Sequence, residues 1–315
     1  MAYFLIIIFL FVLELLYFRL ADRYNIIDKP NERSSHTQVT LRGGGIIYWI
    51  AAVLFFILNY SEFSLVFLLG ISLIAGISFW DDINSVGQKI RLIFHLAGMT
   101  CAFYAVSAFG NYPWWMIVVA YIVFIGIVNA YNFMDGINGI TGLYTVAVLL
   151  PLIYVNERMV AFTEIDFLVY PLLASLVFLF FNFRKRAKAF AGDVGSVSIA
   201  FWVVTLLLLL IVKTQSLVWI GFLLVYGIDS VMTILHRIYL KQNIMEAHRL
   251  HFYQIMANER KQSHLFVSFV VQLICSALII YFFPIIGWWI ITILLFLLTV
   301  VYLLKFKWLS STGGH

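Results

Sequence analysis

The stretch NAYNFMDGINGITG, residues 129–142, lies between two long apolar runs and decides how the whole chain is interpreted. It holds Asn129, Asn132 and Asn138 together with Asp135. A membrane-spanning segment cannot leave amides unpaired in hydrocarbon, because each unsatisfied polar group costs several kcal/mol. We therefore predict a polar junction between two membrane-spanning helices, where water, a metal ion or a substrate supplies the hydrogen-bond partners.

The composition of the chain supports this interpretation. Of its 315 residues, 63% are hydrophobic and only 11% are charged, and the mean hydropathy is +1.00. A soluble domain carries about 25% charged residues. Apolar runs of about 20 residues recur from end to end, and each can cross a hydrocarbon core of about 30 Å. The sequence thus predicts an all-α, polytopic integral membrane protein with a single domain, residues 1–315. Its two cysteines, Cys101 and Cys275, lie in apolar runs and predict neither a disulfide nor a thiolate metal site.

Eleven membrane-spanning helices are predicted from these runs. The first run has no basic segment before it and no small-residue cleavage site after it, so we expect a retained helix rather than a signal peptide. The approximate ranges are 2–20, 44–61, 64–80, 91–110, 114–132, 140–155, 167–183, 196–213, 217–240, 265–283 and 287–304.

The positive charges predict the orientation of these helices. If loops alternate between the two sides of the membrane, 18 of the 20 Lys and Arg residues fall on one side, and only Arg158 and Lys213 fall on the other. Basic loops lie in the cytoplasm, so we expect the N-terminus outside and the C-terminus inside the cell. Residues 129–142 are then cytoplasmic.

The other loops on the predicted cytoplasmic face also carry polar motifs. They are ADRYNIIDKPNERSSHTQVTLRGGG (21–45), FWDDINSVGQKIRL (79–92), NFRKRAKAFAGDVGSVS (182–198) and HRIYLKQNIMEAHRLHFYQ (236–254). Asp and Asn beside Gly suit Mg²⁺, which usually takes one or two carboxylates together with substrate phosphates. Lys and Arg suit the phosphates, and the backbone N–H groups near Gly192 and Gly195 suit a phosphate at a helix start. The residues alone predict a cytoplasmic site that handles phosphate and Mg²⁺.

Each motif also has a simpler interpretation. The basic cluster 184–188 is equally explained by membrane topology or lipid head groups, and Gly192 and Gly195 by close helix packing. The adjacent pair Asp81 and Asp82 is often a helix cap, but it lies at the C-terminal end of a span, where the helix dipole disfavours negative charge. Histidines 248 and 251 lack a third nearby ligand, which disfavours a metal site between them.

Five of these motifs, in order, resemble those of a known enzyme family. DKPNERSSHT with RGGG, DDINSVGQK, NAYNFMDGING, FAGDVGS and HRLH are similar to the successive motifs of the polyprenyl-phosphate N-acetylhexosamine-1-phosphate transferases, the WecA/MraY family, over about residues 28–264. The resemblance implies transfer of a sugar 1-phosphate from a cytoplasmic UDP-sugar to undecaprenyl phosphate, with release of UMP. Such a phosphoryl transfer needs positioning and charge neutralisation more than covalent chemistry.

The resemblance also implies roles for single residues. Asp81 or Asp82 is implied to deprotonate or orient the attacking lipid phosphate. Asp193 is implied to bind Mg²⁺, with Mn²⁺ as an alternative, and Asn132 to assist it. The side chains implied to bind substrate are Arg42, Lys89, Asp135, Asn138, Phe190, His248, Arg249 and His251.

These substrate-binding roles differ from residue to residue. Phe190 is implied to stack on uracil, Asp135 and Asn138 to contact the uridine, and Lys89 to hold a phosphate. The HRLH loop is implied to grip the sugar and pyrophosphate. Position 138 is Asn where many family members carry Asp, so no mechanism here can require a negative charge at that position.

The motifs favour one branch of the family and leave other points open. The arginine-bearing N-terminal loop and HRLH resemble the O-antigen-initiating WecA/WbpL branch, whereas the peptidoglycan branch, MraY, usually shows a run of histidines. Leu41 replaces the proline that usually precedes the arginine of the first motif. Partners are expected to be a UDP-N-acetylhexosamine, undecaprenyl phosphate and the bilayer, with no nucleic acid; the identity of the sugar and a homodimer stay open.

A secondary transporter is the alternative from another class of protein. Transporters place ionisable groups near the bilayer midplane. Asp229 and Glu14 are the candidates for such deep charges, and Asp229 lies eight residues before Arg237, within reach of an internal pair. The remaining acidic residues cluster at loops, which disfavours a transporter.

Overall fold

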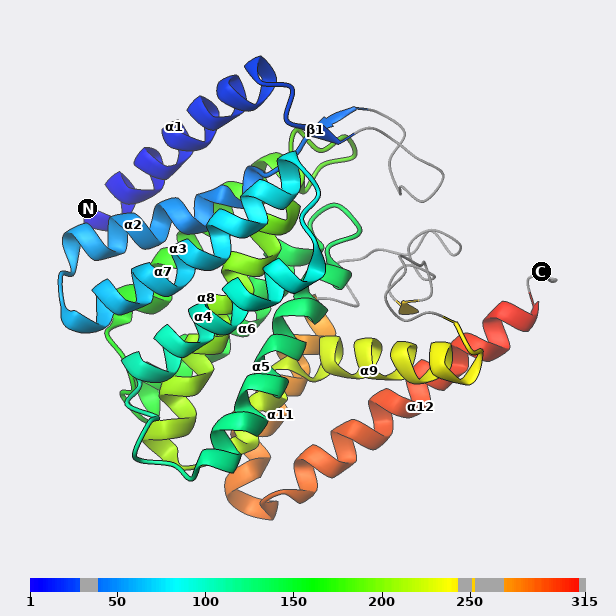
Figure 1. The fold of residues 1–315 in the computed structure, drawn as a ribbon. Helices are drawn as coiled ribbons and strands as arrows, with labels where there is room; N and C mark the ends of the chain where they lie inside the picture. Colours follow the sequence, from blue (N-terminus) through cyan, green and yellow to red (C-terminus); the bar gives the residue numbers. More distant parts are fainter. Residues whose placement is uncertain (29–38, 243–250, 253–268, 312–315) are drawn as a thin grey trace.

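The protein is described by a computed structural model that covers residues 1–28, 39–242, 251–252 and 269–311 (Figure 1). The helices are α1 (Ala2–Arg23), η1 (Gly44–Ile46), α2 (Ile47–Leu58), α3 (Glu62–Ile83), α4 (Gln88–Ala105), α5 (Trp114–Met134), α6 (Ile140–Arg158), α7 (Ile165–Asn182), α8 (Gly192–Thr214), η2 (Leu217–Leu223), α9 (Leu224–Tyr239), α11 (Val271–Ile286) and α12 (Trp289–Ser311). A two-stranded antiparallel sheet joins β1 (Ile27–Asp28) to β2 (Thr40–Leu41). Every predicted span overlaps one of these helices.

Most of the helices are long and apolar enough to cross a membrane. Seven of them meet this description over at least 18 residues: α1, α3, α5, α6, α7, α8 and the combined η2–α9 segment. Shorter apolar helices cover Gly44–Leu58, Val271–Ile286 and Trp289–Leu303. Helix α4 matches a predicted span, but its polar first turn lowers its hydropathy. The expected all-α, polytopic membrane protein is confirmed.

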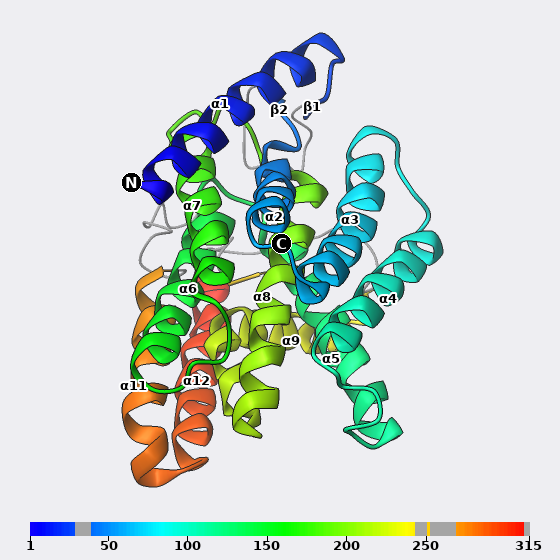
Figure 2. The same ribbon diagram turned by 90° about the vertical axis from the view of Figure 1, so that its left-hand side faces the viewer.

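Helix α8 is the central element of the bundle (Figure 2). Its sequence is apolar on every side after Ser198, and almost all of its side chains are buried. A helix that is hydrophobic all round is expected in the interior of a bundle. Its first turn lies against η1: a Cβ atom on Gly45 would come within 2.2 Å of the Gly195 Cα atom. The two glycines therefore permit the contact that brings the N-terminal loop onto the start of α8, as the close-packing interpretation expected.

Helices α9 and α12 lie side by side on one flank of the bundle (Figure 1). The outer face of α9 exposes Val231, Leu235 and Ile238. Exposed apolar side chains on a long helix suit contact with lipid chains. These two helices therefore border the bundle where it meets the bilayer.

The predicted orientation can be measured with single cysteines. Lys188 follows α7 and Arg158 ends α6, and both side chains are exposed. Because the loops that contain them are predicted on opposite sides of the membrane, Lys188→Cys should react with an impermeant maleimide only after the inner membrane is made permeable. Arg158→Cys should react in intact cells. The reverse pattern would remove the motif loops from the cytoplasm.

Candidate active site

Two loops that are distant in the sequence pair with each other at the start of α8. Phe190 N–H donates to the Leu41 carbonyl oxygen at 2.8 Å, Gly44 N–H to the Phe190 carbonyl at 2.8 Å, and Gly45 N–H to the Ala191 carbonyl at 3.0 Å. These backbone bonds hold the end of β2 beside residues 189–191. They carry Arg42 to the first turn of α8, next to Asp193.

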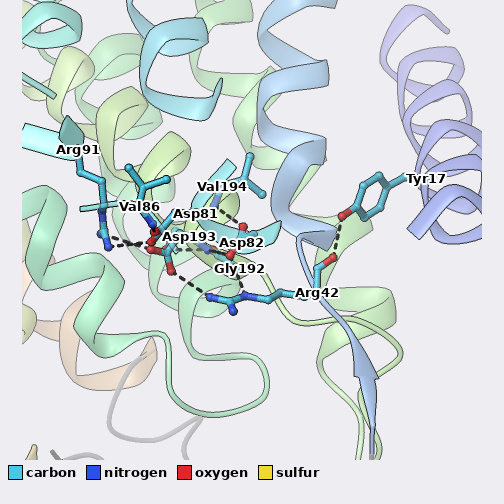
Figure 3. A network of polar contacts seen from close by, with 10 residues as sticks. Tyr17, Arg42, Asp81, Asp82, Val86, Arg91, Gly192, Asp193 and Val194 are labelled. Carbon is cyan, nitrogen blue, oxygen red and sulfur yellow. Dashed lines mark hydrogen bonds and ion pairs between the residues drawn. The ribbon is translucent and has the colours of Figure 1, made fainter. Parts of the chain in front are cut away.

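Asp82 closes the start of α8 from another helix. It lies in the last turn of α3, its side chain is 0% exposed, and its carboxylate accepts the backbone N–H groups of Asp193 and Val194, each at 2.9 Å (Figure 3). A carboxylate that accepts the N–H groups of a first helical turn is an N-cap and complements the helix dipole. Asp82 therefore caps a helix that begins 110 residues later in the chain.

Gly192 makes room for this cap. Its φ is +69°, and a Cβ atom there would lie 2.6 Å from the Asp82 carboxylate. A positive φ strains residues with side chains, and glycine adopts it at little cost. The GD pair of the FAGDVGS motif thus has a structural reason: Gly192 admits the carboxylate that holds the backbone of Asp193.

Asp81 faces a different partner. Its carboxylate accepts the N–H of Val86 and pairs with Arg91 Nη1 at 2.9 Å, which closes the turn between α3 and α4. The same guanidinium approaches Asp193, with 3.3 Å between Nη2 and Oδ2. Asp81 and Asp193 keep 11% and 16% of their side chains exposed, whereas Asp82 keeps none. Of the adjacent pair, only Asp81 faces outward.

Arg42 joins the carboxylates of Asp82 and Asp193. Its Nε lies 2.8 Å from Asp82 Oδ1 and its Nη2 lies 3.7 Å from Asp193 Oδ1. Burial acts to lower the pKa of Arg42, but the charges of Asp82 and Asp193 outweigh it and leave the pKa raised. The Tyr17 hydroxyl of α1 donates to the Arg42 carbonyl at 2.7 Å and fixes the backbone. Among the described residues, three carboxylates thus meet two guanidinium groups, a formal surplus of one negative charge.

The junction after α5 lies beside this cluster. Asn132 is next to Asp193, and its Nδ2 atom is buried without a hydrogen-bond partner in the described part of the chain. Asp135 accepts the Thr141 hydroxyl and lies close enough to Asp193 and Arg42 for their charges to affect its pKa. The opening stretch therefore places an amide and a fourth carboxylate at the site, as its polarity predicted.

The rest of this junction is tied to the loop after α7. Asn138 Nδ2 donates to the Arg184 carbonyl at 2.9 Å. Asn182 accepts the Gly139 N–H at 2.6 Å and donates to the Ala189 carbonyl at 2.8 Å. Asn182 therefore fixes the junction relative to the segment that precedes Asp193.

The structure brings some of the predicted site residues together and leaves others apart. Arg42, Asp81, Asp82 and Asp193 are in contact through ion pairs and hydrogen bonds, and Asn132 and Asp135 lie beside them. Phe190 contributes its backbone to the loop pairing, and Lys89 is exposed in the first turn of α4. His251 contacts Asp229 of α9. His248 and Arg249 lie outside the described residues.

Two residues of the site were missed by sequence reasoning. Arg91 was counted only as a topology charge, although it, and not Lys89, pairs with Asp81 and Asp193. Its position ten residues after Asp81 gives no signal until the α3–α4 turn is known. Asn182 was missed as well; an amide that ends an apolar helix was its only signal.

One expectation about the helix start is wrong. The first N–H groups of α8 were expected to bind a phosphate, but those of Asp193 and Val194 bind Asp82. A carboxylate of the same chain satisfies them first because α3 packs against α8.

The oxygen-rich residues at this site fit a magnesium ion that takes its remaining ligands from water and substrate. Among the described residues, no group of three or more His, Cys, Asp or Glu side chains is arranged to hold a metal. Asp193 supplies one carboxylate, and the amide of Asn132 beside it can supply one oxygen. That is enough for Mg²⁺, which takes one or two carboxylates and completes its shell with water and substrate phosphates. The surplus negative charge favours a cation at this place.

The buried carboxyl group of Asp135 is expected to make the free energy of unfolding depend on pH. Burial raises its pKa to about 7, with the Thr141 hydrogen bond acting against this and the Asp193 charge reinforcing it. Since an unfolded Asp ionises near pH 4, the folded state binds more protons than the unfolded state between these values, and stability falls as the pH rises through this window. We expect Asp135→Asn to remove this component, which cannot exceed about 1.4 kcal/mol per pH unit. Thermal unfolding midpoints at pH 5, 6, 7 and 8 measure it, and parallel curves for both proteins would contradict the assignment.

Comparison with known proteins supports the resemblance found in the motifs. Residues 64–211 match the model of the family described as glycosyl transferase family 4. A Bacillus subtilis (strain 168) protein named probable undecaprenyl-phosphate N-acetylglucosaminyl 1-phosphate transferase is 26% identical over 259 residues, which cover 75% of this chain and 70% of the relative.

Relatives with two different names match to a similar degree. A Thermotoga neapolitana phospho-N-acetylmuramoyl-pentapeptide-transferase is 28% identical over 262 residues, covering 78% of this chain and 85% of the relative. A Yersinia pestis undecaprenyl-phosphate alpha-N-acetylglucosaminyl 1-phosphate transferase is 27% identical over 230 residues, covering 65% and 61%. The predicted resemblance to the WecA/MraY family is confirmed, and relatives named for both of its activities are among the matches.

Proposed function

We propose, from the kinship of this chain with the WecA/MraY family, that it is a polyprenyl-phosphate sugar-1-phosphate transferase of the bacterial plasma membrane. Its reaction moves a HexNAc 1-phosphate from a UDP-sugar to undecaprenyl phosphate, releases UMP and forms undecaprenyl-pyrophosphoryl-HexNAc. This step initiates a cell-surface polysaccharide such as an O-antigen, a capsule or a teichoic-type polymer. The HRLH motif favours this activity over the phospho-MurNAc-pentapeptide transfer of the second branch.

The observation that carries this proposal is the cluster of Asp81, Asp82 and Asp193 with Arg42 and Arg91. The two guanidinium groups neutralise carboxylates here, and guanidinium groups also bind phosphates through parallel hydrogen bonds. A pyrophosphate that enters with a cation can pair with the arginines while the cation pairs with the carboxylates. The cluster therefore has the charges that a phosphoryl transfer requires.

The cluster lies at the ends of apolar helices, where a lipid phosphate and a soluble nucleotide sugar can meet. In the proposed reaction, a phosphate oxygen of undecaprenyl phosphate attacks the phosphorus that carries the sugar. The bond from this phosphorus to the UMP oxygen breaks, and the bond from phosphate to the sugar stays intact. The products are UMP and the lipid-linked pyrophosphate.

The adjacent carboxylates have different roles in this proposal. Asp81 faces outward and orients or deprotonates the attacking lipid phosphate, whereas Asp82 holds the backbone of Asp193 and the guanidinium of Arg42 in place. The partial exposure of Asp81 and the complete burial of Asp82 support this division. A group that accepts a proton from a substrate must be within hydrogen-bonding reach of it, and only Asp81 has an open side.

Asp193 and Asn132 are the residues that would hold Mg²⁺, or Mn²⁺ in its place. The ion, when bound, neutralises charge that develops on the leaving UMP oxygen. Asp135 and Asn138 are proposed to contact the uridine, and Phe190 to stack on uracil. Lys89, exposed at the start of α4, is proposed to contact a phosphate from the rim of the site.

The proposal is tested by following UMP. Membranes containing the protein, or the purified protein in detergent, are incubated with undecaprenyl phosphate, Mg²⁺ and a panel of UDP-HexNAc donors. We expect UMP release with at least one UDP-HexNAc and none without the lipid phosphate. UMP release with UDP-MurNAc-pentapeptide alone would assign the protein to the other branch. If none of the donors in the panel gives UMP release, the proposed function is rejected.

A further inference from the structure

Asp229 of α9 is a carboxylate within a segment long and apolar enough to span the membrane, and its side chain is only 7% exposed. Ionisable residues at such positions are costly and are retained where they serve a function. The reaction proposed above does not use Asp229, and the contacts of its side chain point to a different role.

Three donors converge on one oxygen of this carboxylate. Asp229 Oδ1 accepts the backbone N–H of Phe252 at 2.9 Å and the Thr233 hydroxyl at 3.2 Å, and it lies 3.3 Å from His251 Nδ1. His251 and Phe252 follow α9 in the chain, so two of these contacts bind the segment after α9 to that helix. The Thr233 hydroxyl also contacts the hydroxyl of Tyr302 on α12 at 2.9 Å.

The contact is enclosed on all sides. The His251 side chain is 3% exposed, and Tyr302 is 2% exposed. The Phe252 ring lies beside Tyr302, with 6.2 Å between the ring centroids. A hydrogen bond to a charged acceptor contributes more when both groups are buried, so this arrangement fixes the loop at this point.

We propose that Asp229 is a positioning residue for the HRLH loop: it anchors His251 and Phe252 to α9 and thereby places the sugar-phosphate donor contacts of that loop. In the sequence, His248 and Arg249 come three and two residues before His251. The contact between Asp229 and His251 Nδ1 also selects the tautomer of His251. An imidazole that donates from Nδ1 keeps its lone pair on Nε2. The inference rests on the proposed function, because it assigns the loop to donor binding.

This role explains the deep charge without transport. A carboxylate that served a transported ion would have to exchange its partners during the cycle. Asp229 instead holds a backbone N–H and a side chain that lie 22 and 23 residues further along the chain. It is therefore placed as a fixed anchor between a membrane helix and a loop.

The test compares Asp229→Asn with the wild type by two measurements. Asparagine keeps the size of the side chain but removes its charge, so the bond to Phe252 N–H and the contact with His251 weaken. We expect faster hydrogen–deuterium exchange in the peptide that contains Phe252, and a donor KM raised about tenfold with kcat within about threefold. Asp166→Asn, the same change at the first turn of α7, should alter neither measurement.

A double-mutant cycle shows whether Asp229 acts through His251. If it does, adding Asp229→Asn to His251→Ala should raise the donor KM much less than it does in the wild type. Independent, multiplying effects would overturn the inference, as would unchanged exchange at Phe252 or faster exchange with an unchanged donor KM. The exchange measurement does not require an active protein. If the wild type releases no UMP, the proposed function is rejected, and the exchange at Phe252 still tests whether Asp229 anchors this segment.

Discussion

Asp193→Asn is expected to reduce UMP release by about 10²- to 10³-fold, the loss typical when one preorganised electrostatic group is removed from an active site. The substitution keeps the shape of the side chain and removes the charge that Arg42 and Arg91 approach at 3.7 and 3.3 Å. The backbone N–H of Asp193 still binds Asp82, so the first turn of α8 is retained. The turnover number for UMP release, measured at saturating UDP-sugar and lipid phosphate, checks this prediction.

A second measurement isolates the metal. A ligand that binds only the folded protein raises its unfolding temperature, so Mg²⁺ should stabilise the wild type more than Asp193→Asn. Asp166→Asn is a matched control, because Asp166 lies at the opposite end of α7 from the site, about 25 Å along the helix axis. Full turnover in Asp193→Asn, or an undiminished response to Mg²⁺, would reject Asp193 as a ligand.

Asp82→Ala is expected to destabilise the protein by about 3 kcal/mol, whereas Asp81→Ala should cost about 1 kcal/mol. Removing Asp82 leaves Arg42 without its nearest carboxylate and exposes two N–H groups at the start of α8. The expected cost lies at the low end of the range for a broken buried ion pair because a third of the Arg42 side chain is exposed. Thermal unfolding in detergent, followed by near-ultraviolet circular dichroism, measures both variants.

The two carboxylates should also differ in activity. Asp81→Asn should lose turnover while keeping nearly the wild-type unfolding temperature, since Asn still accepts the Val86 N–H. Asp82→Asn provides a milder test than Asp82→Ala if the latter does not accumulate in membranes. A larger loss of stability from Asp81→Asn than from Asp82→Asn would reverse the proposed roles.

The helices were predictable from the sequence because hydrocarbon imposes a simple requirement. A helix that crosses it needs about 20 apolar residues, so α1, α5 and α8 appear in the sequence as apolar runs near their observed bounds. The convergence of the motif loops was also predictable, because successive loops of a membrane protein alternate between its two faces and every second loop lies on the same face. This was sufficient to bring Arg42, Asp81 and Asp193 to one site.

The partners within the site were not predictable in this way. The resemblance implied that Asp81 or Asp82 acts on the lipid phosphate, and the position of the pair at the end of α3 made a helix cap a weak interpretation. The observed cap belongs to α8, because packing of α3 against α8 brings the carboxylate to a first turn elsewhere in the chain. Arg91 was obscured for the same reason: hydropathy locates α4 but does not determine which side chain of its first turn faces α3.

The cap of α8 by Asp82 also has a consequence for biogenesis. The ribosome adds about 5–20 residues per second, so the 111 residues between Asp82 and Asp193 take roughly 6–20 s to synthesise. During this interval Arg42 is already present and can pair with Asp82, but the two amide donors do not yet exist. A nascent chain arrested before α8 keeps this carboxylate incompletely satisfied at the membrane boundary. Insertion of the central helix therefore completes the α8 cap and brings Asp193 to Arg42 and Asp82 in one event.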